Sequence, residues 1–247
     1  MKTLYPLLLL LLLSSTATAD WDRWYLMQTD QGTTSLVTAA IQETVKTESD
    51  GRVFYQAHVW KREDGFLNEE HLGIYSKSDS SVAPLSFSFV RKYRQTEDQL
   101  DGKVDGNKLV VTGTISGRKM PPVRKSLPKG TIFVSLFPYW LSKKTDVPDT
   151  AVTAPLKKGV NKWFSFYAVA EDSVDRRFQP MSGRVRAEAL DDLARATGTA
   201  KYSVEFQGQP SVWYVKPEGY PVRYTFSKTG RTVVEVPEAE ARKFTQQ

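Results

Sequence analysis

Histidine and cysteine most often carry nucleophilic or metal chemistry, and this 247-residue chain holds few of them. It contains no cysteine and two histidines, His58 and His71. Without cysteine the chain has neither a catalytic thiol nor a thiolate metal ligand. The flanking sequences, Gln-Ala-His-Val-Trp and Glu-Glu-His-Leu, lack the spacing of a metal-binding motif. Glu70 and His71 could pair as a base and its orienting group, but an exposed pair in a loop or at a strand edge is favoured.

The other polar residues indicate no reaction. The sequence has no nucleophile elbow, phosphate-binding loop or dinucleotide fingerprint. Asp191 and Asp192, with Glu188 close by, are typical of a charged helix face, and a metal site there is a weaker interpretation. We therefore expect a protein without catalytic residues, metal ligands or a cofactor.

Aromatic residues are the more suggestive set, because ligand cavities are lined by such side chains with few polar groups among them. For any one of them, filling of an ordinary core is the alternative. Trp60, Trp213 and Tyr214 fit either strand packing or an aromatic rim. As a set, the following residues are predicted to line an apolar ligand site: Phe87, Phe89, Phe133, Phe137, Tyr139, Trp140, Trp163, Phe166, Tyr202 and Phe206.

Residues 1–19 have the order of a cleavable signal peptide. Lys2 precedes a leucine run that ends at Leu13, and small residues follow up to Ala19. The run is shorter than the roughly 20 residues that cross a bilayer, which argues against a transmembrane anchor. We expect cleavage after Ala19, with residues 20–247 as a single domain. Because no cysteine follows, a lipid anchor has no attachment point, and we expect a periplasmic or secreted protein that does not span the membrane.

The charge and the lack of cysteine bear on compartment and partners. The formal charge of +6 becomes +5 when Lys2, the one charged residue of the first 19, is removed. This excess suits a protein near anionic lipid or a polyanionic cell wall, but ordinary solubility is the favoured explanation. An export signal without a dense basic run disfavours nucleic acid. An exported chain that folds without disulfides favours a bacterial envelope.

Alternating apolar and polar residues predict a mainly β fold. The clearest predicted strand is 85–93, where Phe87 and Phe89 share one face and serines occupy the other. Residues 73–76 predict a short strand. Aspartate-glycine pairs recur between the strands and indicate antiparallel hairpins: Asp50-Gly51, Asp64-Gly65, Asp101-Gly102 and Asp105-Gly106. The later strands are predicted at 163–170, 201–207, 212–215, 222–226 and 232–236.

Residues 128–144 interrupt this alternation with a dense apolar run. Proline is tolerated in the first turn of a helix, so we expect a short helix that begins near Pro138. Lys143 and Lys144 would lie at its carboxyl end, where a positive charge is favoured. This segment is predicted to act as a lid packed on the concave face of the sheet. Further short helices are predicted at 186–196 and 238–244.

The order of these parts resembles a known superfamily. The chain opens with Trp24-Tyr25, continues through long antiparallel strands to a central Leu127-Pro128-Lys129-Gly130 run, and closes with Gly219-Tyr220-Pro221-Val222-Arg223. It resembles the half-barrel superfamily of Lol-type lipoprotein carriers, most of all its uncharacterised periplasmic domains, some attached to transglutaminase-like proteins. The resemblance implies an open half-barrel: a curved antiparallel sheet with one or two short helices on its concave side, around an apolar cavity.

Two functions follow as expectations. The first is an exported, non-catalytic protein that binds an apolar or amphiphilic ligand, such as a lipid or a lipoprotein acyl chain, in the half-barrel cavity. The second is an envelope interaction or accessory module with a solid core, whose protein partner docks on an edge strand or a basic surface. An open cavity would distinguish the first from the second.

Overall fold

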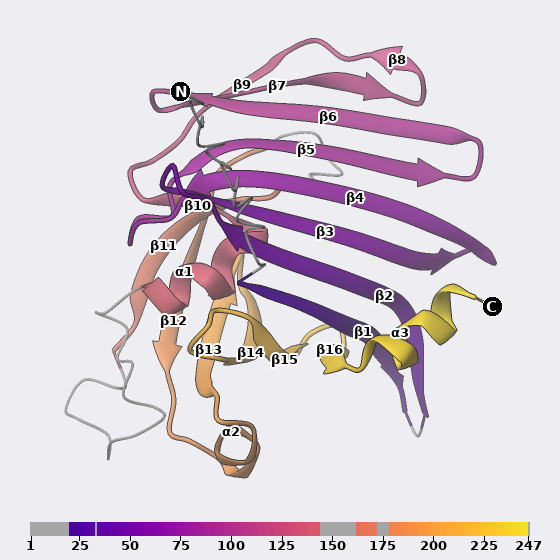
Figure 1. Ribbon diagram of the computed structural model, residues 1–247, viewed down its shortest axis with the longest axis vertical. Coiled ribbons are helices and arrows are strands. Elements are labelled where there is room, and N and C mark those ends of the chain that lie inside the picture. The colour runs from indigo at the N-terminus through magenta and orange to yellow at the C-terminus, as the bar shows by residue number, and fades with distance from the viewer. Residues whose placement is uncertain (1–19, 33, 144–161, 172–177, 247) are drawn as a thin grey trace, which may run out of the picture.

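All strands of the described chain belong to one curved sheet. The structure, a computed structural model, describes residues 20–32, 34–143, 162–171 and 178–246. The predicted signal peptide at 1–19 and Lys144 therefore lie outside the described residues. The sheet has 16 strands in the order β10-β11-β12-β13-β14-β15-β16-β1-β2-β3-β4-β5-β6-β7-β8, with β9 also paired to β7 (Figure 1). Its two ends do not pair with each other, so the predicted open, antiparallel, mainly β architecture is confirmed.

The amino-terminal half is an antiparallel meander of mostly long strands that pair in sequence order, except that the last of them, β9, pairs with β7. Its strands are β1 (Trp21–Gln31), β2 (Thr34–Thr47), β3 (Arg52–Glu63), β4 (Phe66–Lys77), β5 (Pro84–Tyr93), β6 (Thr96–Asp105), β7 (Lys108–Ile115), β8 (Arg118–Lys119) and β9 (Val123–Ser126). At the β3–β4 turn Asp64 and Gly65 have φ of 51° and 79°. Positive φ at both central residues is the geometry that tight hairpins need.

The carboxyl-terminal half is a second meander. Its strands are β10 (Thr131–Phe133), β11 (Phe164–Val169), β12 (Met181–Ala187), β13 (Ala200–Phe206), β14 (Gln209–Val215), β15 (Pro221–Phe226) and β16 (Arg231–Val236). Strand β10 pairs in parallel with β11, whereas the other pairings are antiparallel. The two halves join because the last strand, β16, pairs with the first, from Trp24 opposite Val236 to Thr29 opposite Arg231.

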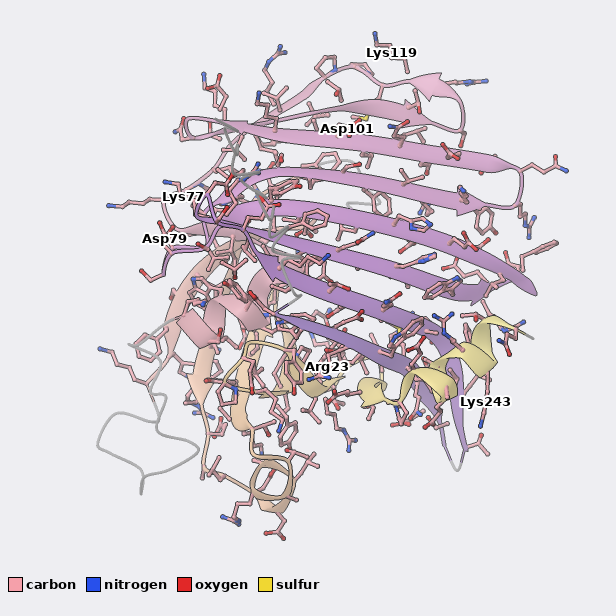
Figure 2. All side chains as sticks on the ribbon, in the orientation of Figure 1. Arg23, Lys77, Asp79, Asp101, Lys119 and Lys243 are labelled. Carbon is pink, nitrogen blue, oxygen red and sulfur yellow. The ribbon has the colours of Figure 1, made fainter. Side chains whose placement is uncertain are left out.

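Side chains at this junction connect the halves further. Arg23 of β1 lies beside the carboxyl-terminal strands (Figure 2), and its guanidinium carbon is 4.4 Å from the centre of the Tyr220 ring. Its Nη2 donates to the Tyr220 hydroxyl at 3.2 Å, and its Nε is 3.3 Å from Glu235 of β16. Trp21 packs on the same Tyr220 ring, with centroids 5.7 Å apart. These contacts join β1 to the carboxyl-terminal strands on the inner face of the sheet.

The predicted central helix lies on the inner, concave face. A 3₁₀ turn, η1 (Val134–Leu136), leads into α1 (Phe137–Lys143), and Pro138 occupies the first turn, where its missing N–H costs nothing. Phe137 and Trp140 are 4% and 6% exposed and belong to the main core, which both halves of the sheet share. The β14–β15 turn supports the helix. At Gly219, with φ of 91°, an added Cβ would lie 3.0 Å from the Cα of Tyr139.

The other helices lie elsewhere. Strand alternation directs Trp24 and Leu26 to the outer face of β1, and they pack with Ala241 and Phe244 of α3 (Glu238–Thr245). The carboxyl-terminal helix, predicted at 238–244, therefore covers the convex side (Figure 1). Helix α2 (Asp192–Thr197) is a single short element between β12 and β13. No helix among the described residues is long and apolar enough to cross a membrane.

Two local predictions were wrong, and one strand was predicted too short. Asp101-Gly102 is not a turn but lies inside β6, where the Phe87 ring packs directly over Gly102. The helix predicted at 186–196 starts only at Asp192, because residues 186 and 187 belong to β12, a strand that was not predicted, and residues 188–191 form no regular element. The strand predicted at 73–76 is the end of the 12-residue β4. At Gly102 and at residues 186–187, pairing with a neighbouring strand overrides the local residue preference.

Candidate ligand-binding cavity

A cavity of about 390 Å³ lies between α1 and the inner face of the sheet. The helix side contributes Val134, Ser135, Phe137 and Pro138. The sheet contributes residues from both meanders: Met27, Glu43, Tyr55, Phe166, Ala168, Val204, Phe206, Gln207, Gln209, Ser211, Trp213, Pro221, Tyr224, Phe226, Thr229 and Arg231. An apolar cavity of about 150 Å³ already accepts a benzene ring, so this one has room for a larger apolar group.

Aromatic rings form the wall of the cavity. The Trp213 and Tyr224 rings stack with centroids 4.1 Å apart and planes 6° apart. Phe137 of α1 meets Trp213 edge-on at 5.5 Å and lies 4.9 Å from Phe166. The Trp213 Nε1 donates to the Ser211 hydroxyl at 2.9 Å, so its polar edge is satisfied. The rings therefore present apolar surface and few unsatisfied polar atoms to the cavity.

The position of Phe166 depends on a glycine. Phe166 stands opposite Gly183, which stands opposite Phe206 on the next strand. The Phe166 ring lies across Gly183, where an added Cβ would come within 2.4 Å of a ring carbon. It stacks on Phe206 with centroids 6.0 Å apart and planes 7° apart. Gly183 thus lets two aromatic rings on alternate strands form one continuous wall.

A carboxyl group belongs to the inner part of the cavity lining. Glu43 lies on β2 between Ile41 and Val45, two buried inner-face residues, and is itself half-buried. Desolvation by burial raises the pKa of Glu43 to about 7, although a hydrogen bond from the Tyr55 hydroxyl opposes this. Burial and the nearby Glu43 also raise the pKa of Tyr224. Near neutral pH, Glu43 can therefore accept or donate a hydrogen bond inside an otherwise apolar space.

Exposed polar residues at the tips of two hairpins mark the mouth of the cavity. Gln207 and Gln209 flank the β13–β14 turn, and Thr229 and Arg231 flank the β15–β16 turn. The mouth carries the positive charge of Arg231, whereas Glu43 lies among buried inner-face residues. An apolar wall with polar groups at one open end is suited to a ligand that has an apolar part and a polar part.

Three of the ten predicted ligand-site residues, Phe137, Phe166 and Phe206, line this cavity. Six others are buried in the main core without lining it: Phe87, Phe89, Phe133, Tyr139, Trp140 and Tyr202. Trp163 is half-buried, and the guanidinium carbons of Arg184 and Arg186 lie 4.7 and 4.9 Å from its ring centre. Contact between the ten predicted residues and a ligand stays a prediction. The position of the cavity restricts this prediction to the three residues that line it.

Sequence reasoning missed Glu43 and Tyr55 and left the role of Trp213 open. One signal for Glu43 was present. It is the charged residue at an inner-face position of β2, between Ile41 and Val45, and such an interruption of an apolar face points to a functional or paired carboxyl. Nothing local marks Tyr55, because its partner Glu43 lies on the neighbouring strand.

The prediction for the histidines was wrong about their location. His58 and His71 lie directly opposite each other on β3 and β4, in the interior of the sheet and on its outer face, and their side chains are 25% and 39% exposed. Burial, followed by the charge of His71, lowers the pKa of His58 to about 4. The carboxylate beside them is Glu69, whereas Glu70 pairs with Lys61 at 2.7 Å.

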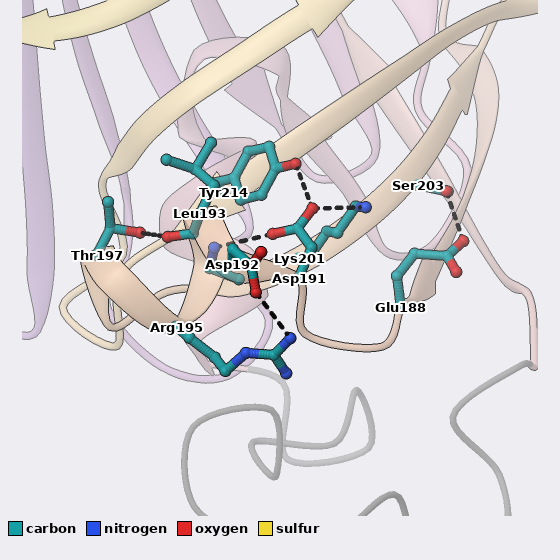
Figure 3. Close-up of polar contacts among 10 residues, drawn as sticks. Glu188, Asp191, Asp192, Leu193, Arg195, Thr197, Lys201, Ser203 and Tyr214 are labelled. Atoms are coloured by element: carbon teal, nitrogen blue, oxygen red, sulfur yellow. Dashed lines mark hydrogen bonds and ion pairs between the residues drawn. The ribbon is translucent and has the colours of Figure 1, made fainter.

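The acidic residues considered as a weak metal site are held by other partners (Figure 3). Asp191 caps α2 by accepting from the backbone N–H of Ala194 at 2.9 Å, and it also accepts from Lys201 and from the Tyr214 hydroxyl, each at 2.8 Å. Although desolvation opposes the change, these hydrogen bonds lower the pKa of Asp191 to about 2. The cluster therefore fixes α2 against β13 and β14.

The second acidic residue of that region, Glu188, is also occupied. Its Oε1 is 2.6 Å from Arg186 and accepts from the Ser203 hydroxyl. Asp192 is 3.2 Å from Arg195 on the same helix. Each of the three carboxylates therefore has a cationic partner, and Asp191 and Glu188 also accept from a hydroxyl. The predicted charged helix face is wrong for two of them, because Glu188 precedes α2 and Asp191 is its N-cap.

Comparison with solved structures identifies the fold. The chain is similar to a beta-barrel-like protein of domain of unknown function DUF1849 from Brucella abortus, with a TM-score of 0.55 and 13% identity over 87% of this chain and 95% of that one. A DUF1089 family protein from Pseudomonas aeruginosa is more distant, with a TM-score of 0.42 and 13% identity over 74% and 87% of the two chains. No family model matches the sequence, and no curated protein matches it. The chain has a beta-barrel-like fold, which it shares with the protein from Brucella abortus.

Proposed function

We propose that this protein is an exported, non-catalytic carrier or receptor for an amphiphilic ligand, such as a lipid or a lipoprotein acyl chain. The observation that carries the proposal is the cavity between α1 and the inner face of the sheet, with aromatic walls and a polar mouth. Its volume of about 390 Å³ lies in the range of roughly 300–1,000 Å³ of small-molecule sites. The resemblance to Lol-type carriers points to the same class of ligand.

The ligand orientation follows from the distribution of polar groups. The apolar part of the ligand would contact Phe166, Phe206 and Trp213, whose rings line the cavity. The polar part would remain at the mouth beside Arg231. Glu43 and Tyr55 offer a hydrogen-bonding partner inside the cavity for a ligand that carries a second polar atom. A solid core, as in the alternative accessory module, would leave no such space.

The test uses a neutral solvatochromic dye that fluoresces in apolar surroundings, and two valine-to-phenylalanine variants. Val204 lines the cavity, so Val204→Phe fills it. Val212 lies on β14 between Ser211 and Trp213, so its side chain points to the opposite face, and Val212→Phe is the matched control. We expect dye affinity to fall at least about tenfold, or 1.4 kcal/mol, in Val204→Phe and to stay unchanged in Val212→Phe.

Equal dye binding in both variants, or none in the wild type, would contradict the proposal. In that case recovery of one stoichiometric protein by crosslinking in envelope extract would favour the accessory module. Export is tested separately by mass spectrometry of the amino-terminal peptide after expression with the full sequence. We expect the mature chain to start at Asp20, and an intact Met1 in the envelope fraction would contradict cleavage.

A further inference from the structure

The outer face of the sheet carries a cluster of two histidines and a glutamate, remote from the cavity on the inner face. His58 of β3 and His71 of β4 face each other with ring centroids 3.8 Å apart. Glu69, two residues before His71, presents its Oε2 at 4.0 Å from His58 Nε2 and at 3.8 Å from His71 Nε2. One ligand atom from each residue lies within 4.8 Å of the other two.

We propose that His58, Glu69 and His71 bind one divalent transition-metal ion, with zinc as the representative, and that water completes its coordination. Two imidazoles and one carboxylate form a donor set that zinc accepts in sites with an open position. Ligands about 2.05 Å from a tetrahedral zinc are roughly 3.3 Å apart. The observed 3.8 and 4.0 Å exceed this by about 0.5 and 0.7 Å, and all three donor atoms lie within 4.8 Å of one another, so side-chain rotations can bring them to one ion.

A second observation points to a missing partner at the same place. His58 Nε2 is buried and makes no hydrogen bond to any residue that the structure describes. Its distance of 4.0 Å to Glu69 is too long for a hydrogen bond. A buried ring nitrogen without a partner is unfavourable, and most such groups in proteins are satisfied. A metal ion between the three side chains would supply this partner.

The surroundings hold the cluster in place but leave it accessible. The ligands project from two neighbouring strands in the interior of the sheet, which restrains them better than a loop would. The Trp60 ring lies 3.6 Å from the His58 ring, and Trp24 stacks on Trp60 at 5.6 Å. With side-chain exposures of 25% for His58 and 39% for Glu69 and His71, solvent reaches the cluster. An ion can therefore enter and keep bound water.

One neighbour opposes the ion. Lys92 of β5 stands opposite Glu69 in the β4–β5 pairing, and its charge acts on His58. A positive charge at this position weakens binding of a cation. Replacing Lys92 with glutamine should therefore strengthen metal binding. If the cluster only packs the two strands together, the substitution should not change the affinity for metal.

The test is isothermal titration of zinc chloride into the full chain, produced without a polyhistidine tag, with Glu69→Gln and His71→Asn as ligand variants. Glu70→Gln is the matched control, because Glu70 is adjacent but points to the other face, where it pairs with Lys61. We expect one zinc per chain in the wild type and in Glu70→Gln. The ligand variants should lose more than the roughly 10–100-fold that removal of an outer-shell partner costs, and Lys92→Gln should bind more tightly than the wild type.

Absence of saturable zinc binding in the wild type would overturn the proposal, and so would equal affinity in the wild type and both ligand variants. A urea unfolding curve of each variant shows whether it is folded. If either substitution prevents folding, the comparison of Lys92→Gln with the wild type still decides, since an unchanged zinc affinity there contradicts an ion beside Glu69.

Discussion

The carboxyl group of Glu43 in the cavity lining gives a pH-dependent prediction that can be worked out from its surroundings. Its folded-state pKa is raised from 4.5 to about 7 because burial disfavours the charged form. Between these two values the unfolded chain has lost the proton while the folded protein still holds it. The free energy of unfolding therefore falls as the pH rises from 4.5 to 7, and the loss is constant above pH 7.

The size of the effect follows from the pKa difference. A difference of about 2.5 corresponds to up to roughly 3 kcal/mol of stability lost at pH 8 relative to pH 4. Glu43→Gln keeps a neutral side chain of the same shape at every pH and so removes this loss. The variant and the wild type should be equally stable near pH 4, and the variant should be more stable by up to roughly 3 kcal/mol at pH 8.

Urea denaturation of both proteins at several pH values from 4 to 8.5 measures this difference directly. The exposed Glu97 provides a control, because Glu97→Gln removes a charge without touching the cavity. A stability difference between Glu43→Gln and the wild type that is flat with pH, or that grows toward acid, would refute the reasoning. A control that shows the same pH dependence as Glu43→Gln would refute it as well.

Three further predictions concern packing and capping. Trp140→Ala should lower the free energy of unfolding by roughly 3–5 kcal/mol and weaken dye binding, because Trp140 contacts the cavity-lining Phe137 and Phe166; an unchanged melting temperature would contradict the placement of α1. Gly183→Ala and Gly102→Ala each place a methyl group against an aromatic ring and should each lower the free energy of unfolding by about 1–3 kcal/mol. Only Gly183→Ala, which displaces the cavity-lining Phe166, should reduce dye affinity. Equal dye affinities of the two variants would count against Phe166 as part of the cavity wall. Asp191→Ala should cost about 0.5–2 kcal/mol through loss of the α2 cap, measured by urea unfolding at pH 7. Because the pKa of Asp191 is lowered to about 2, its contribution should be lost as the pH falls below about 4, and a variant difference that persists at pH 2 would be inconsistent with this.

Features that are local in sequence were the ones predicted correctly. Strand β5 alternates Phe87 and Phe89 with serines, and the position of Pro138 in the helix follows from its fixed φ and missing N–H. The hairpin at Asp64-Gly65 follows from its turn residues. Pairing of the last strand with the first was not predictable in this way, because it joins residues about 200 positions apart, such as Trp24 and Val236.

The aromatic site was predicted only in part, because composition does not tell which ring lines a space and which fills the core. Phe166 and Phe87 are both inner-face phenylalanines over a glycine on the neighbouring strand, yet Phe166 lines the cavity and Phe87 does not. The histidine cluster was missed for a related reason. Metal-binding motifs are recognised by spacing along the chain, whereas His58 and His71 meet across the β3–β4 pairing.

The central claim is that an amphiphile occupies the cavity between α1 and the inner face of the sheet. A crystal structure of the protein with a brominated fatty acid tests it directly, because the anomalous scattering of bromine locates the alkyl chain. We expect the bromine signal beside Phe166, Phe206 and Trp213, with the carboxylate at the mouth near Arg231. A saturated crystal with bromine only on the outer surface of the sheet, and none in the cavity, would contradict the claim.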